Sequence, residues 1–163
     1  MGFTARFGTI AVVAAVAGLV LASSGPIKAA LMGEAAVKAR VAAMKDNGKN
    51  VKAIQGFLKE GKGTVADVAK HATAIAATAK KIPSLFPKGS GRGDLSDKQT
   101  RALPAIWTDW AGFEKDAGAL KAAAEKLATV AKAGDKDAIG KQVAEVGKAC
   151  GGCHKAFRGE EVK

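Results

Sequence analysis

Five residues near the C-terminus combine two thiols and an imidazole at a spacing that can hold a prosthetic group. Cys150 and Cys153 are separated by two glycines, and His154 follows directly. A Cys-x-x-Cys-His segment is the attachment pattern of c-type haem: the thiols form thioether bonds and the histidine binds the iron. On a helix these positions are i, i+3 and i+4, so their side chains share one face. The spacing therefore predicts one covalently bound haem c with its iron.

Three other kinds of site contain a Cys-x-x-Cys pair. A thioredoxin-like redox motif would need a βαβ context, and the chain shows no strand pattern. A zinc site would need further ligands. The chain has only these two cysteines and two histidines, His71 and His154, and His154 lies too close to Cys153 for the usual second pair. A plain disulfide would leave His154 without a role. Haem attachment is the interpretation that uses all three residues.

The first 30 residues differ in composition from the rest. Arg6 is the only charge before an apolar run of about 13 residues, and small residues at 22–24 and 29–30 offer cleavage points. The run is shorter than the ~20 residues that a membrane-spanning helix needs. We therefore predict a signal peptide over 1–30, a mature domain over 31–163, a periplasmic location and no stable membrane span after processing. Retention as an uncleaved anchor is the alternative.

The chain is strongly basic. Its formal net charge is +11, and removing residues 1–30 takes away Arg6 and Lys28 and no acids, so the mature charge is 24 − 15 = +9. The lysines are spread over every segment, whereas a nucleic-acid-binding protein would gather them in a cluster. We therefore expect no nucleic acid as partner. The charge is suited to steering the protein towards acidic redox partners, although solubility alone would also explain it.

Apolar residues recur at helical spacing in four segments of the mature chain. They predict helices over about 31–61, 64–82, 104–132 and 135–157, with the haem motif on the core face of the last. Residues 83–103 begin with two prolines and three glycines, which predicts an irregular connection across one end of a bundle.

Local signals mark where these helices begin and end. Thr64 is placed as an N-cap, with Asp67 at the capping-box position. Pro83 ends the second helix, Pro104 suits the first turn of the third, and Gly134 is placed as its C-cap.

Several stretches besides the haem motif resemble the cytochrome c-prime family, the class II c-type cytochromes, over essentially the whole mature chain. They are RVAAMK at 40–45, LFPKGSG at 85–91, IWTD at 106–109 and GKACGGCHKAFR at 147–158. The resemblance implies an all-α fold, an antiparallel four-helix bundle with covalently attached haem c. It also implies a monomer or a homodimer, since family dimers use the outer faces of the first two helices.

Within this family the residue opposite His154 decides the chemistry. In high-spin members an apolar side chain of the first helix crowds the iron without binding it, whereas in the low-spin cytochrome c-556 branch a methionine is the sixth ligand. Met44 occupies that position, and residues 44–48 are especially similar to the low-spin branch. A methionine on an apolar stripe can also serve packing alone. Arg40 is similar to an arginine near a haem propionate in high-spin relatives; a solvated charge is the alternative.

The predicted function follows from this ligand set. An iron bound by His154 and Met44 has no open position, so we predict a carrier of single electrons rather than an enzyme. No paired carboxylates or Ser/His/Asp arrangement stands out in the sequence. One alternative is a five-coordinate protein that binds nitric oxide or carbon monoxide. Another is a haem-carrying module of a larger respiratory assembly. His71 is next in line as sixth ligand if Met44 does not bind.

Overall fold

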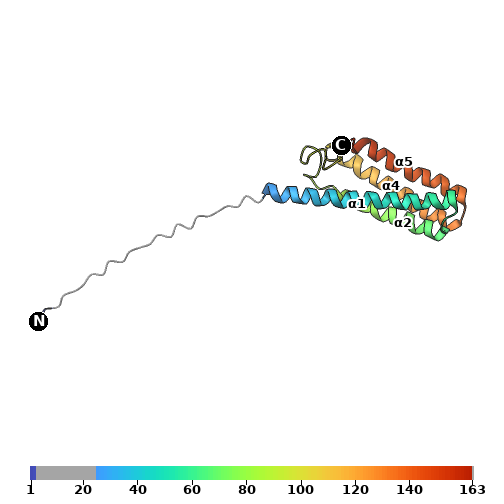
Figure 1. Ribbon diagram of the computed structural model, residues 1–163, viewed down its shortest axis with the longest axis horizontal. Helices are drawn as coiled ribbons and strands as arrows, with labels where there is room; N and C mark the ends of the chain where they lie inside the picture. Colours follow the sequence, from blue (N-terminus) through green and yellow to red (C-terminus); the bar gives the residue numbers. More distant parts are fainter. Residues whose placement is uncertain (3–24, 163) are drawn as a thin grey trace.

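The structure is a computed structural model that describes residues 1–2 and 25–162. Four long helices lie side by side (Figure 1): α1 (Gly25–Glu60), α2 (Val65–Lys81), α4 (Trp110–Ala133) and α5 (Lys136–Phe157). Two short elements, η1 (Pro83–Leu85) and α3 (Ala105–Thr108), lie in the connection between α2 and α4. The predicted all-α antiparallel four-helix bundle is confirmed. Most of the predicted signal peptide, with the cleavage points at 22–24, lies outside the described residues.

Short-range hydrogen bonds explain several of the helix boundaries. The backbone N–H of Asp67 donates to Thr64 Oγ1 at 3.2 Å, and that of Thr64 donates to Asp67 Oδ2 at 2.9 Å, which completes the predicted capping box. Gly134 ends α4 with φ of 79°, a left-handed conformation that glycine adopts without strain. Asp135 caps α5 by accepting from the N–H groups of Asp137 and Ala138.

Two boundaries differ from the prediction. The segment predicted as one helix over 104–132 is interrupted at Asp109, which has φ −124° and ψ 59°. Its carboxylate accepts from the Gly112 N–H at 3.1 Å, so Asp109 ends α3 and caps α4. Among the described residues the first helix spans Gly25–Glu60, so it includes the six residues before the predicted start at residue 31. It continues without a break through 46–48, as predicted.

An aromatic cluster joins the core at the end of the bundle that holds the connection. The Phe113 ring packs edge-on against Phe86 at 4.8 Å and against Phe157 at 5.3 Å, measured between ring centroids. Trp110 lies 5.6 Å from Phe113. Six of the eleven residues that α2 and α4 bury are alanines, which lets their backbones approach closely. No helix of the described residues is long and apolar enough to cross a membrane.

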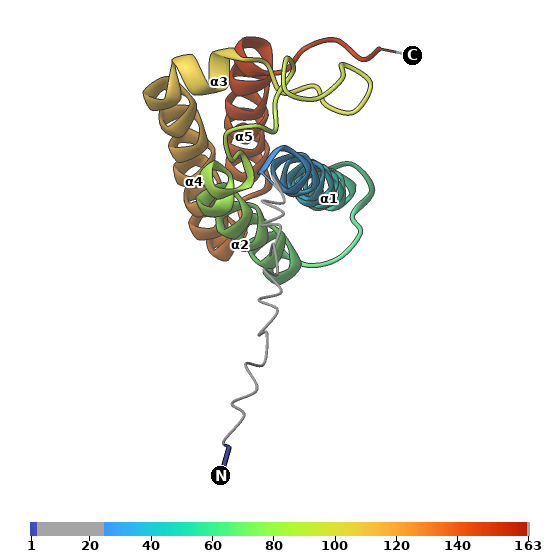
Figure 2. The same ribbon diagram turned by 90° about the vertical axis from the view of Figure 1, so that its left-hand side faces the viewer.

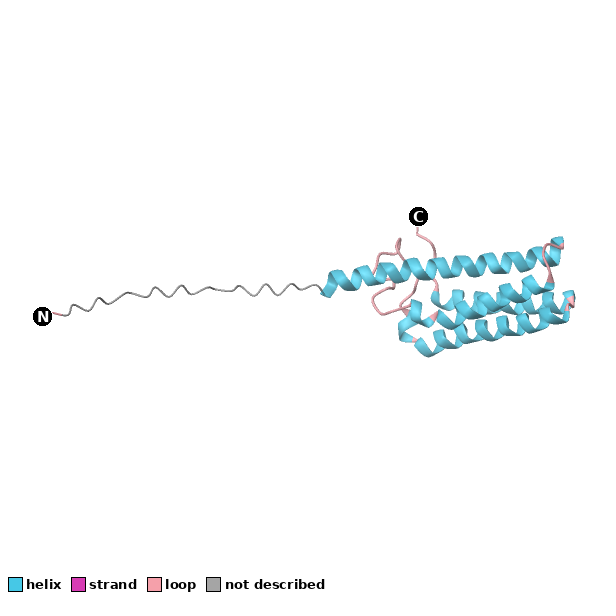
Figure 3. Ribbon diagram, turned by 90° about the horizontal axis from the view of Figure 1, so that it is seen from below, coloured by secondary structure: helices cyan, strands magenta, loops and turns pink. Residues whose placement is uncertain are grey.

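The long connection and the C-terminus share one end of the bundle with the first half of α1 (Figures 2 and 3). Backbone pairing joins them: Ala102 forms a bridge with Arg158, and the Gly159 N–H donates to the Arg101 carbonyl at 2.8 Å. This pairing holds the connection against the end of α5, where the haem motif lies.

A glycine lets α1 approach this connection. A Cβ atom on Gly33 would lie 2.6 Å from the carbonyl oxygen of Gly89, so backbone would have to move. We expect Gly33→Ala to lower the free energy of unfolding by roughly 1–3 kcal/mol through overpacking. Gly56→Ala is the matched control, because nothing lies within 4 Å of its added Cβ. It should gain up to about 1 kcal/mol from helix propensity. Urea unfolding measures the free energy of unfolding of both variants. An equal gain in the two variants would contradict the close approach of α1 to the connection at Gly33.

Candidate haem site

Helix α5 places the three residues of the haem motif together. Cys150, Cys153 and His154 lie within its last turns, and each is half-buried. Both cysteines pack against the hydrophobic core, so their shared face points inward. The helix ends just beyond them, where the Arg158 N–H donates to the His154 carbonyl at 3.1 Å. The three residues that the sequence predicts to hold one haem therefore lie together on one helix.

Burial keeps these groups uncharged. Loss of solvent raises the pKa of the Cys150 thiol, and it raises that of Cys153 to about 11, with smaller contributions from Asp116 and Cys150. Burial also lowers the pKa of His154, helped by the positive charges of Arg158 and Arg101. A neutral imidazole is the form that binds iron. Buried neutral thiols are poor redox nucleophiles, which disfavours the thioredoxin-like alternative.

A contact at the far end of the bundle sets the register between α1 and α5. Lys136 Nζ, at the start of α5, lies 5.2 Å from the ring centroid of Phe57, near the end of α1. The helices run antiparallel, and each rises ~1.5 Å per residue. Met44 lies 13 residues before Phe57 and Cys150 lies 14 residues after Lys136, so both are about 20 Å from that contact. Met44 is half-buried and packs against the core. Counted along the two helices from this contact, Met44 lies at about the level of Cys150.

Arg40, one turn before Met44, is buried with only 5% of its surface exposed. Its Nη1 donates to Ser90 Oγ at 2.9 Å, and its Nη2 donates to the Ser90 carbonyl and to Thr100 Oγ1, each at 2.6 Å. The guanidinium carbon lies 4.7 Å from the centroid of the Phe86 ring. The alternative that Arg40 is a solvated charge is wrong.

No carboxylate among the described residues forms an ion pair with Arg40. Burial without an anion lowers the pKa of its guanidinium to about 10. The charge persists at neutral pH, and a nearby anion would stabilise it. A haem propionate is such an anion.

These residues fit a haem c. Cys150 and Cys153 would hold it covalently and His154 would bind the iron, while Met44 and Arg40 remain candidates for the sixth ligand and a propionate contact. The sequence predicted all five, but it did not predict the groups that bond Arg40. Ser90 lies in the family-like stretch 85–91, but the resemblance gives it no role, and Thr100 carries no pattern that marks it in advance.

Replacing Arg40 tests how much its hydrogen bonds stabilise the protein. We expect Arg40→Met to lower the free energy of unfolding by roughly 2–4 kcal/mol, because hydrogen bonds from a charged group are lost in the interior. Lys45→Met removes the same charge from an exposed position of α1 and should change stability by no more than about 0.5 kcal/mol. Urea unfolding of both holoproteins measures the difference. Equal losses would mean that the connection does not depend on Arg40.

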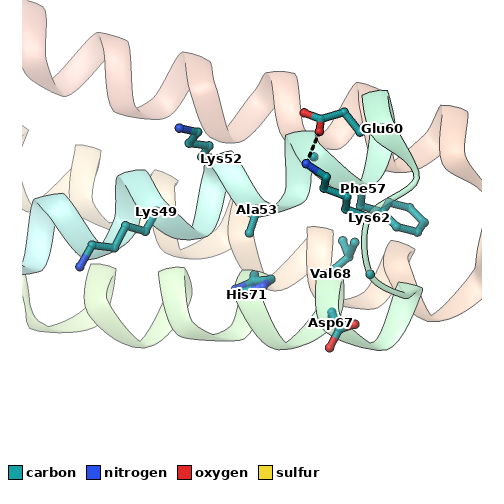
Figure 4. Close-up of a pocket in the computed structure, with 11 residues that line it drawn as sticks. Lys49, Lys52, Ala53, Phe57, Glu60, Lys62, Asp67, Val68 and His71 are labelled. Carbon is teal, nitrogen blue, oxygen red and sulfur yellow. Dashed lines mark ion pairs between the residues drawn. The ribbon is translucent and has the colours of Figure 1, made fainter.

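A groove of about 510 Å³ lies between α1 and α2, away from the haem motif (Figure 4). His71 lines it from α2, and its Nδ1 lies 2.8 Å from Asn50 Oδ1. Asn50 is six residues beyond Met44, which is about 9 Å further along α1. His71 therefore contacts α1 about two turns further from Arg40 than Met44 lies. The groove is bordered by lysines and has an apolar floor that includes Ala53, Phe57 and Val68.

Comparison with known proteins places this chain in a family. The family model described as "Cytochrome C'" matches residues 35–158. Cytochrome c' of Pararhodospirillum photometricum is 38% identical over 125 residues, which are 77% of this chain and 97% of the relative. Cytochrome c-556 of Agrobacterium tumefaciens (strain II Chrys) is 32% identical over 123 residues, 75% of this chain and 95% of the relative.

A solved structure agrees in fold as well as in sequence. The nitric oxide complex of a variant of cytochrome c prime from Alcaligenes xylosoxidans aligns with a TM-score of 0.67 and 26% identity. The alignment covers 78% of this chain and 97% of that chain. Members of this family carry covalently attached haem c with its iron, which agrees with the placement of the two thiols and the imidazole on α5. The chain belongs to the cytochrome c' family.

Proposed function

We propose that this protein transfers single electrons through a haem c whose iron is bound by His154 and Met44. The position of Met44 carries the proposal: it lies on the inward face of α1, at the level of Cys150, and packs against the core. A thioether is a soft ligand that suits haem iron and raises its reduction potential. Bound haem supplies an iron that alternates between the ferric and ferrous states.

The chain's own residues would prepare this site for electron transfer. His154 and Met44 would fill both axial positions, so that no substrate could bind to the iron. Cys150 and Cys153 would fix the haem to α5, and Arg40 would neutralise a propionate. Because these groups sit on helices of one bundle, their positions would change little between the two redox states.

The net charge and the N-terminal composition of the chain suit an electron carrier in an oxidising compartment. The mature charge of +9 favours encounter with acidic redox partners. The composition of residues 1–30 supports export to the periplasm. We propose a monomer or homodimer there, without a catalytic reaction of its own.

The visible spectrum of the purified ferrous protein tests the proposal. We expect a low-spin spectrum and negligible binding of carbon monoxide, because Met44 holds the sixth position. A high-spin ferrous spectrum with rapid carbon monoxide uptake would overturn it. That result would favour the second candidate, a five-coordinate haem that binds diatomic gases. The nitric oxide complex of the Alcaligenes xylosoxidans relative supports that candidate.

A further inference from the structure

Asn47 is a buried amide in the middle of α1. Only 6% of its surface is exposed, and neither its Oδ1 nor its Nδ2 has a hydrogen-bond partner among the described residues. Leaving such a group unpaired costs about 1–3 kcal/mol. Native interiors rarely contain an amide that is unpaired at both ends. Its burial therefore indicates a partner that becomes available only when the haem is bound.

The position of Asn47 limits what that partner is. Asn47 lies three residues after Met44 and seven after Arg40, so the three share the inward face of α1. Helical side chains tilt towards the N-terminus, which directs the Asn47 amide over the turn that holds Met44. In the register set by Lys136 and Phe57, Asn47 lies level with Val146, one turn from Cys150.

A bound haem offers polar groups at its propionates and at the axial positions of its iron. Arg40 is the group placed for a propionate, and it lies on the opposite side of Met44 from Asn47. The thioether sulfur of an iron-bound Met44 is therefore the polar atom that the Asn47 amide can reach.

We propose that Asn47 Nδ2 donates a hydrogen bond to the thioether sulfur of Met44 when that sulfur binds the iron. Asn47 is then a positioning residue for the sixth ligand, and this role rests on the proposed function. Hydrogen-bond partners of this kind orient a metal ligand. Their loss typically lowers metal affinity or activity about 10- to 100-fold. Without the donor, Met44 leaves the iron more readily.

Asn47→Leu tests this role, because leucine has nearly the same shape and cannot donate. Imidazole is titrated into the ferric holoprotein, where it competes with Met44 for the sixth position, and the visible spectrum records the displacement. We expect about tenfold tighter apparent imidazole binding than in the wild type. Melting of the variant should show no gain in stability, since the Nδ2 group that it removes is hydrogen-bonded in the holoprotein.

Asn50→Leu is the matched control. Asn50 lies one turn further along α1, and its side chain bonds His71 on α2. Its replacement should lower the melting temperature and leave imidazole binding unchanged. If Asn47 had a purely structural role, Asn47→Leu would likewise lower the melting temperature and leave imidazole binding unchanged. If Asn47→Leu does not yield holoprotein, Asn47→Ala is titrated in the same way.

The outcomes separate this proposal from the proposed function. Unchanged imidazole binding in a low-spin Asn47→Leu protein overturns only the role of Asn47. A higher melting temperature in the same variant would show that the amide is unpaired in the holoprotein as well. A wild-type protein that is already high-spin overturns the proposed function, and this inference with it.

Discussion

Replacing Met44 by alanine is expected to turn a low-spin ferrous protein into a high-spin one that binds carbon monoxide. Alanine is too short to reach the iron, so the sixth position opens while His154 remains in place. Apparent carbon monoxide affinity should rise at least about tenfold, since every 1.4 kcal/mol of competing Met44 binding is a factor of ten. Visible spectra of the ferrous protein, with and without carbon monoxide, measure both effects.

Met32→Ala is the matched control, because Met32 lies on the same helix with 60% of its surface exposed. Its replacement should leave the spectrum unchanged. If Met44→Ala stays low-spin, another side chain binds the iron, and His71 is then the first to test. If the wild type and Met44→Ala are both high-spin and bind carbon monoxide alike, Met44 serves packing alone. A gas-binding function would then account for the site.

Much of the fold follows from short-range signals in the sequence. Thr64 and Asp67 are three residues apart and cap their helix without help from the rest of the chain. Gly134 ends α4 for an equally local reason, its left-handed backbone. The break at Asp109 was not predicted. The apolar residues on both sides keep a helical spacing, and a helical pattern alone does not distinguish an N-cap aspartate from a surface one.

The surroundings of the site depend on contacts between distant parts of the chain. Arg40 bonds Ser90 and Thr100, which are 50 and 60 residues away. No local pattern shows that this arginine is buried, and its resemblance to a family arginine left a solvated charge open. Asn47 is a similar case, because its sequence environment of Asp46 and Gly48 suggests a weak point of the helix rather than a buried amide. Pattern reasoning predicted the haem motif, but only the folded chain shows that Arg40 and Asn47 are buried.

Removing the two thiols is expected to have the largest effect on the protein. In Cys150→Ser/Cys153→Ser no thioether can form, so acidified acetone should extract all of the haem, whereas it should extract none from the wild type. Each single variant keeps one thioether and leaves one vinyl group of the haem unreacted. Its haem should stay on the protein, with an absorption band shifted to longer wavelength in the pyridine complex. Gly151→Ser is the control, because Gly151 is exposed and nothing lies within 4 Å of its added Cβ.

The double variant also measures how far the fold depends on haem. The side chains of Met44, Cys150, Cys153 and His154 are only half-buried by the polypeptide, and much of the remaining core is alanine, which buries little apolar surface per residue. Haem is therefore expected to supply a large share of the apolar body at this end of the bundle. The double variant should lose most of its cooperative thermal transition in circular dichroism, while Gly151→Ser keeps it. A double variant that melts like the wild type would show that the helices pack without haem. Covalent haem in that variant would mean that the thiols are not the attachment points.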